Sequence, residues 1–169
     1  MNYKEIISSI KNKELKPVYF LMGDEPYYID KLCTEFGKNI LSVEEQEFNL
    51  VTLYAENTTI ENIISEAKQF PFGSEKRVII IKEAQKIKNI EILDSYLDHP
   101  QQTTILVIAY KKKSIDKRKK FGKNLSTKCV LFESKKLYEN QITHFTFPPK
   151  FCVRDFARIY HGYIVLKYF

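Results

Sequence analysis

The turn that follows the apolar run at 17–22 is the first place where this sequence could bind a phosphorylated ligand. A phosphate loop has the pattern G-x-x-x-x-G-K-[ST], in which small residues let backbone N–H groups reach the phosphates. Counted from Gly23, the second glycine position holds Tyr28, the lysine position holds Ile29 and the Ser/Thr position holds Asp30. The sequence therefore predicts a degenerate phosphate loop, and no cofactor is expected.

Two acidic residues, Asp24 and Glu25, lie in the same turn. They could imitate the acidic pair of an ATPase, but they follow the wrong strand, and a helix cap with a favourable dipole contact is the better interpretation. His99, His144 and His161 are the only histidines, and no cysteine has one of them nearby at metal-ligand spacing. No catalytic constellation and no metal site are predicted.

Three widely spaced cysteines, Cys33, Cys129 and Cys152, indicate reduced thiols. The first sixteen residues are charged throughout, and no apolar run approaches the roughly 20 residues of a membrane span. We expect a cytoplasmic protein that does not contact a membrane.

A basic cluster lies between residues 111 and 123 of a chain whose formal net charge is +6. Such a cluster could contact a nucleic-acid backbone, which requires only charge and reach. The alternative is a solvated helix face. The candidates for contact with DNA are Lys117, Arg118, Lys119 and Lys120, flanked by Lys111–Lys113 and Lys123.

The segment Phe70-Pro71-Phe72 places two aromatic side chains around a proline, next to Gly73. Phe70 follows Ala67 by three residues, so helical spacing favours a core position for it. Phe72 lies beyond the proline and is the better candidate for an exposed anchor that fills a pocket on a partner. Folding of Phe72 back over the sheet edge is the alternative.

Apolar runs that alternate with helix-period stretches predict a three-layer α/β domain with a five-stranded, mainly parallel sheet. One helix is expected to begin with a capping box in which Thr58 caps and Glu61 reaches back, and to end at Pro71. The expected strands are 17–22, 47–54, 77–81, 103–110 and 128–132; the expected helices begin at Pro26 and Thr58 and span 87–97 and 114–125.

The composition changes near Lys135, beyond which aromatic residues are dense and no clear period is found. We assign residues 1–140 to the α/β domain. Residues 141–169 are either the start of a second domain or an aberrant or truncated tail.

Four segments, taken in order, resemble the N-terminal domain of the DNA polymerase III delta subunit family, the clamp-opening arm of the bacterial clamp loader. They are PVYFLMGDEPYYIDKL, QFPFGSEKRVIIIKEA, IDKRKK and KKLYENQI, and together they cover about residues 1–142. The resemblance implies an AAA+/RecA-like P-loop-type fold that has lost its ATP site. It also implies a subunit of a DNA polymerase holoenzyme that has no catalytic residues of its own.

The same resemblance implies a partner, the beta sliding clamp, and an apolar clamp-binding pair at Pro71 and Phe72, flanked by Phe70. Some members carry leucine where this chain has Pro71. The other implied partners are the tau/gamma and delta prime subunits of the loader. Residues 143–169 do not resemble the family's lid domain, so a truncated chain, a frameshifted product and a naturally short variant stay open. So do two other functions, a nucleotide-binding AAA+ ATPase and a basic nucleic-acid-binding module.

Overall fold

Continuous apolar runs form the centre of the fold, and β1 (Val18–Gly23) is buried along its whole length. The computed structural model describes residues 1–135. The other strands are β2 (Leu50–Tyr54), β3 (Arg77–Lys82), β4 (Thr104–Lys111) and β5 (Val130–Ser134). They form one sheet in the order β2-β3-β4-β1-β5, and every neighbouring pair is parallel. The predicted five-stranded parallel sheet is confirmed.

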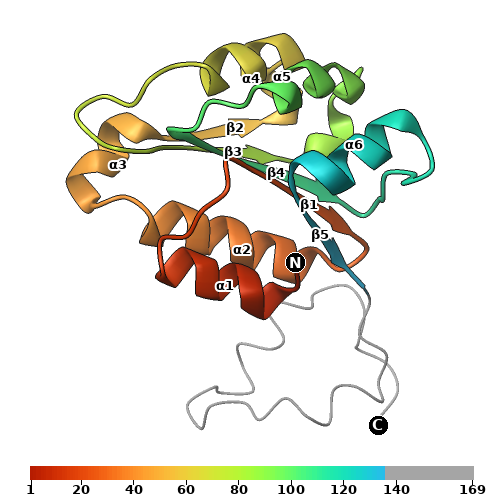
Figure 1. Ribbon diagram of the computed structural model, residues 1–169, viewed down its shortest axis with the longest axis horizontal. Helices are drawn as coiled ribbons and strands as arrows, with labels where there is room; N and C mark the ends of the chain where they lie inside the picture. Colours follow the sequence, from red (N-terminus) through yellow and green to blue (C-terminus); the bar gives the residue numbers. More distant parts are fainter. Residues whose placement is uncertain (136–169) are drawn as a thin grey trace, which may run out of the picture. The chain divides into compact units, whose positions relative to one another are not determined.

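Helices cover both faces of this sheet and give the predicted three layers (Figure 1). On one face, α1 (Tyr3–Lys11) and α2 (Pro26–Asn39) share an apolar core with the strands. On the other, α4 (Ile60–Ala67), α5 (Asp94–Asp98) and α6 (Lys120–Lys128) enclose a second core. Three 3-10 turns, η1 (Ala55–Asn57), η2 (Ala84–Lys86) and η3 (Ile90–Leu93), connect these elements.

A helix at the edge of the sheet, α3 (Val43–Asn49), was not predicted, and the strand expected over 47–54 begins only at Leu50. The hydroxyl of Ser42 accepts a hydrogen bond from the N–H of Glu45, and the Glu45 carboxylate accepts one from the N–H of Ser42. This capping box starts a helix that continues through residues 47–49. The strand interpretation was wrong for those three residues.

The cap and the end of α4 also differ from the prediction. Thr59, not Thr58, is the cap, because its hydroxyl accepts the N–H of Asn62 at 3.3 Å. The residue three positions on is then asparagine, so no capping box forms. The helix ends at Ala67, four residues before Pro71, so the proline is not what stops it.

Two other helices are shorter than expected. The stretch 87–97 divides into η3 and α5 after Asn89, whose φ of +54° is left-handed. The predicted helix over 114–125 begins only at Lys120, because Asp116 accepts the N–H of Arg118 and holds the preceding residues in a turn. The remaining four strands match their predicted bounds to within two residues.

Among residues 1–135, no helix is both long enough and apolar enough to cross a membrane. The domain boundary expected at residue 140 and the assignment of 141–169 lie outside the described residues, as do His144, His161 and Cys152.

Candidate functional site

The connection from α4 to β3, residues 68–76, extends away from the sheet beside α3 (Figure 1). We call this connection the tip. Phe72 is 73% exposed on it, which confirms the predicted exposure. Phe70 is 74% exposed, so its predicted place in the core was wrong. Pro71 between them is half-buried.

The backbone explains why Phe70 points outward. The helical phase ends at Ala67, whose carbonyl accepts a hydrogen bond from the buried hydroxyl of Tyr96 at 3.2 Å. The Gln69 carbonyl accepts a weaker one from Thr104 at 3.4 Å. These side chains turn the chain before Phe70, so the three-residue spacing from Ala67 no longer places that ring on the buried face.

Asn49, the last residue of α3, holds the backbone of Phe72 from both sides. Its side-chain oxygen accepts the Phe72 N–H at 2.7 Å, and its side-chain nitrogen donates to the Phe72 carbonyl at 2.8 Å. Asn49 is completely buried, although asparagine is usually exposed. A buried amide with both functions satisfied fixes the position of the aromatic residue without covering its ring.

The end of the tip that joins β3 is also held in place by the backbone and by side-chain contacts. Gly73 adopts φ +61°, a left-handed conformation that glycine accepts without strain. The N–H of Arg77 donates to the Thr103 carbonyl at 2.9 Å, and its guanidinium pairs with Glu66 at 2.6 Å. Phe72 is therefore presented on a supported loop.

A third exposed aromatic residue, Phe48 of α3, packs against Phe72 with ring centroids 5.6 Å apart. Phe48 is 60% exposed. The sequence reasoning missed both Phe48 and Asn49 because it placed them in a strand. The Ser42–Glu45 capping box was the signal that could have located them in a helix.

The turn after β1, by contrast, offers few free donors to a phosphate. The N–H of Gly23 donates to the Lys113 carbonyl at 3.1 Å, and that of Asp24 donates to the Ser134 carbonyl at 3.2 Å. The N–H of Tyr27 donates to the Glu25 carboxylate at 3.2 Å, as the helix-cap interpretation predicted. These three N–H groups are therefore already engaged within the protein, and the loss of nucleotide binding stays a prediction.

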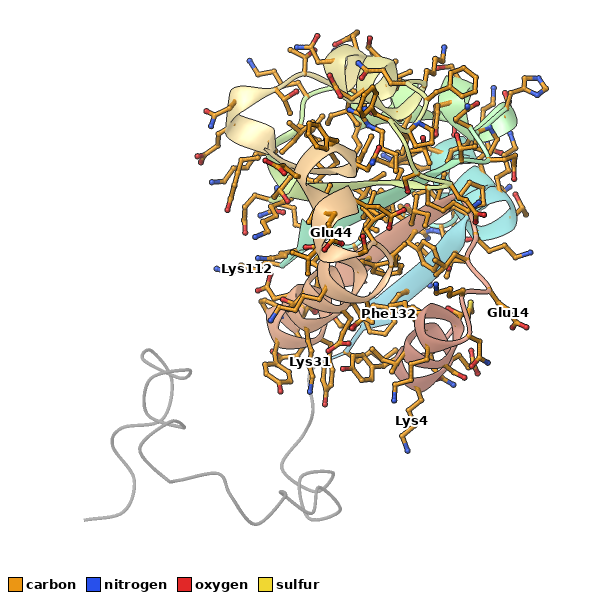
Figure 2. The ribbon with its side chains drawn as sticks, turned by 90° about the vertical axis from the view of Figure 1, so that its left-hand side faces the viewer. Lys4, Glu14, Lys31, Glu44, Lys112 and Phe132 are labelled. Atoms are coloured by element: carbon orange, nitrogen blue, oxygen red, sulfur yellow. The ribbon has the colours of Figure 1, made fainter. Side chains whose placement is uncertain are left out.

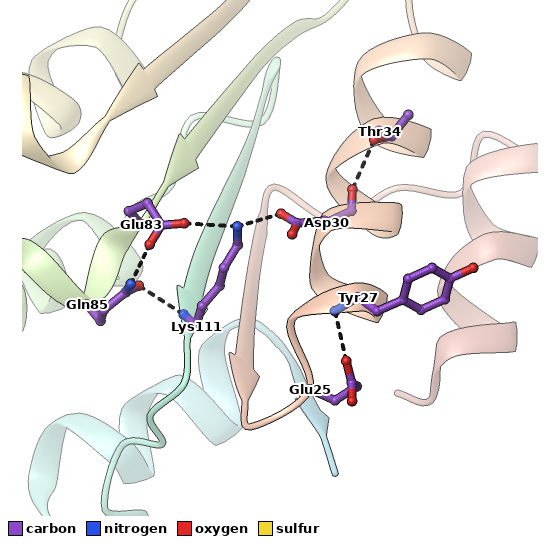
Figure 3. Close-up of polar contacts among 7 residues, drawn as sticks. All are labelled: Glu25, Tyr27, Asp30, Thr34, Glu83, Gln85 and Lys111. Atoms are coloured by element: carbon purple, nitrogen blue, oxygen red, sulfur yellow. Dashed lines mark hydrogen bonds and ion pairs between the residues drawn. The ribbon is translucent and has the colours of Figure 1, made fainter. Parts of the chain in front are cut away.

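A lysine bridges two acidic side chains at the same edge of the sheet (Figure 3). Lys111 ends β4, and its ammonium nitrogen lies 2.6 Å from Asp30 of α2 and 2.9 Å from Glu83 after β3. Gln85 donates to Glu83 and accepts the N–H of Lys111. Lys111 is 13% exposed, so it belongs to this bridge and not to the surface cluster in which the sequence placed it.

The bridge changes the protonation of its members. Burial opposes the charge on Lys111, but the two carboxylates outweigh it, so the pKa of the ammonium group is raised. The hydrogen bond from Lys111, aided by one from Gln85, lowers the pKa of Glu83. Both groups are thus held in their charged forms at neutral pH.

The four candidates for DNA contact are all exposed, but they are not equivalent. Lys117 pairs with Glu133 at 2.5 Å, and Arg118 pairs with Asp116 at 3.1 Å. Lys119 and Lys120 form no ion pair within residues 1–135. Contact with DNA by the four candidates stays a prediction.

The described part of the chain holds no group of three or more metal-binding side chains. His99 is exposed, as expected for a turn residue. Cys33 and Cys129 are free thiols, and burial raises the pKa of each to about 12.

Comparison with known proteins agrees with this architecture. The sequence model of the family "DNA polymerase III, delta subunit" matches residues 19–135. The DNA polymerase III subunit delta of Bacillus subtilis is 30% identical over 152 residues, which is 84% of this chain and 44% of that protein. The present chain thus spans less than half the length of this relative.

Solved structures give the same result. The Bacillus subtilis DNA clamp loader delta protein superposes with a TM-score of 0.73 at 30% identity, covering 83% of this chain and 44% of that one. A gamma subunit-related protein from Thermotoga maritima, with a TM-score of 0.55 and 8% identity over 82% of this chain and 47% of that one, shares the fold alone. This chain belongs to the DNA polymerase III delta subunit family.

Proposed function

We propose that this chain binds a sliding clamp through the tip and helps to open the ring during DNA replication, as a clamp-loader delta subunit. The observation that carries the proposal is Phe72, a 73% exposed aromatic side chain whose backbone is fixed by a buried asparagine. Aromatic anchors held in this way dominate many protein interfaces, because little entropy is lost on binding.

The proposed action is mechanical. A ligand shifts a conformational equilibrium only by its differential affinity for the two states, so Phe72 must bind the open ring more tightly than the closed one. No bond is made or broken, and no nucleotide is required by this domain. The engaged N–H groups of Gly23 and Asp24 support that view against the alternative of an ATPase.

Calorimetric titration of the 169-residue chain into the clamp of its own organism tests the proposal. We expect a Kd of about 1 μM or tighter, and at least tenfold weaker binding for Phe72→Ala, as is typical of a hot-spot residue. Tyr54→Ala is the matched control, because Tyr54 is 49% exposed at the opposite end of β2 from α3. Unchanged affinity for Phe72→Ala would remove this site from the proposal.

Opening of the ring is tested separately from binding, by comparing the affinity of the chain for open and closed forms of the clamp. A clamp variant whose ring interface is broken by substitution, and which is therefore permanently open, should bind the chain more tightly than the closed ring does. Equal affinity for the two forms would leave binding in place and exclude a direct role in opening.

A further inference from the structure

We propose that the clamp-binding surface continues from the tip onto α3, where Phe48 is a second aromatic anchor and acidic side chains contact a basic rim on the clamp. This inference rests on the proposed function, because it names further residues of the same interface. Its starting observation is the contact between Phe48 and Phe72, whose ring centroids are 5.6 Å apart with an interplanar angle of 51°.

The two rings form one surface although they come from different elements. Phe48 remains 60% exposed and Phe72 73% exposed, so their mutual contact leaves most of each ring open to solvent. Asn49, adjacent to Phe48, forms hydrogen bonds with both backbone polar groups of Phe72 and so keeps the two rings side by side. A pocket that accepts Phe72 must then accommodate or cover Phe48 as well.

The acidic side chains of α3 indicate which kind of residue should surround that pocket on the clamp. Glu44 precedes Phe48 by four residues and therefore lies on the same face of the helix, one turn away. Figure 2, which faces this side of the molecule, labels Glu44 on α3. Glu44 and Glu47 are exposed and form no ion pair within residues 1–135. By charge complementarity, the clamp should present basic side chains beside its apolar pocket.

Aromatic contact is tested by titrating the clamp with the full chain and its Phe48→Ala and Phe72→Ala variants. We expect Phe48→Ala to raise Kd about tenfold, while Tyr54→Ala changes Kd less than about twofold. The melting temperature of each variant is measured alongside, and the exposure of Phe48 predicts little change in it.

Charge is tested with Glu44→Lys and its matched control Glu61→Lys. Both residues are exposed and occupy the second position of their helices, so each substitution places a positive charge in the first turn of a helix. We expect Glu44→Lys to weaken binding about fivefold at low salt and less at about 0.5 M salt, since screening removes surface attraction. The control should change affinity less than about twofold.

The outcomes separate this inference from the proposed function. If Phe72→Ala loses affinity while Phe48→Ala and Glu44→Lys bind like wild type, the proposed function stands and the extension onto α3 is overturned. If Phe72→Ala binds like wild type, both are overturned. Tenfold weakening by Phe48→Ala, together with a salt-dependent effect of Glu44→Lys, supports the extension.

Discussion

The side chain of Asn49 makes two hydrogen bonds to the backbone of Phe72, 2.7 Å from its nitrogen and 2.8 Å from its oxygen. The two residues are 23 positions apart, so the bonds join α3 to the tip across the sheet edge. They allow the ring of Phe72 to be exposed while its backbone is fixed. Presentation of an apolar side chain to a partner depends here on a polar residue that is itself completely buried.

Asn49→Ala should lower the free energy of unfolding by about 1–3 kcal/mol, because it leaves two partly buried backbone groups unpaired. Urea denaturation measures the decrease, and faster hydrogen exchange at the Phe72 amide would locate it in the tip. Asn49→Asp keeps the acceptor but sets a carboxylate against the Phe72 carbonyl. Its stability deficit should therefore shrink as the pH falls and the acid becomes a donor; a pH-independent deficit would contradict the assigned hydrogen bonds.

The sheet could be predicted from sequence because its strands are short apolar runs, and a run such as the one that ends at Gly23 fits few alternatives. The tip could be predicted only in part. The exposure of Phe72 follows from a local signal, the proline and glycine around it. The exposure of Phe70 depends on hydrogen bonds from Tyr96 and Thr104, which are distant in the sequence. No periodicity contains that information.

The bridge from Lys111 to Asp30 and Glu83 could not be predicted from the sequence either. Lys111 lies at the start of a basic run, and composition alone assigns it to the exposed cluster. Only the parallel pairing of the strands brings it to Asp30 and Glu83. Contacts between the ends of different strands cannot be inferred before the strand order is known.

Lys111→Met should reduce the free energy of unfolding by about 1.5–3 kcal/mol at neutral pH, because it leaves two carboxylates without their common partner. The exposed neighbour Lys112 supplies the control, and Lys112→Met should cost much less. Urea midpoints of both variants and wild type give the comparison. Equal midpoints for the two variants would show that the bridge contributes no stability.

The difference in unfolding free energy between wild type and Lys111→Met should depend on pH, and the direction follows from the shifted pKa values. The lowered pKa of Glu83 contributes stability above its unfolded pKa of about 4.3, and this is lost as the pH falls through the folded value. The raised pKa of Lys111 contributes below about 10.4 and is lost as the pH rises through its folded value. The gap between wild type and Lys111→Met should therefore be widest between these limits and shrink at acid and alkaline pH.

Two glycines should respond differently to alanine. In Gly23→Ala, the added Cβ would lie 2.1 Å from the Ser134 carbonyl oxygen, at φ +126°, so we expect destabilisation by about 3 kcal/mol or more. In Gly73→Ala, at φ +61° and with no atom within 4 Å, only the left-handed strain of about 1–2 kcal/mol remains. Thermal unfolding of the two variants measures which is less stable. A lower melting temperature for Gly73→Ala than for Gly23→Ala would contradict the close packing of Gly23 against Ser134.

Of the four candidates for contact with DNA, Lys117 and Arg118 form ion pairs, whereas Lys119 and Lys120 form none within residues 1–135. If the basic cluster binds duplex, Lys119→Glu with Lys120→Glu should reduce the slope of log K against log salt by about 0.9 for each phosphate that the variant no longer neutralises. The matched control, Lys117→Glu with Arg118→Glu, removes charges that are already paired and should reduce the slope less. Fluorescence anisotropy at several salt concentrations measures both. Equal slopes for wild type and the first variant would exclude this cluster as the region that binds DNA.

Two thiols, that of buried Cys33 and that of partly buried Cys129, give a direct probe of native packing. With pKa values of about 12, Cys33 and Cys129 hold about three thousandfold less thiolate than an ordinary cysteine of pKa about 8.5. Since the thiolate is the reactive form, both should react slowly with a disulfide reagent at about pH 8 in a Cys152→Ser variant, which leaves only these two thiols. Urea should raise the rate in step with unfolding, because it exposes both residues together. Rapid modification of the buried Cys33 in the folded variant would mean that the surrounding structure opens without global unfolding.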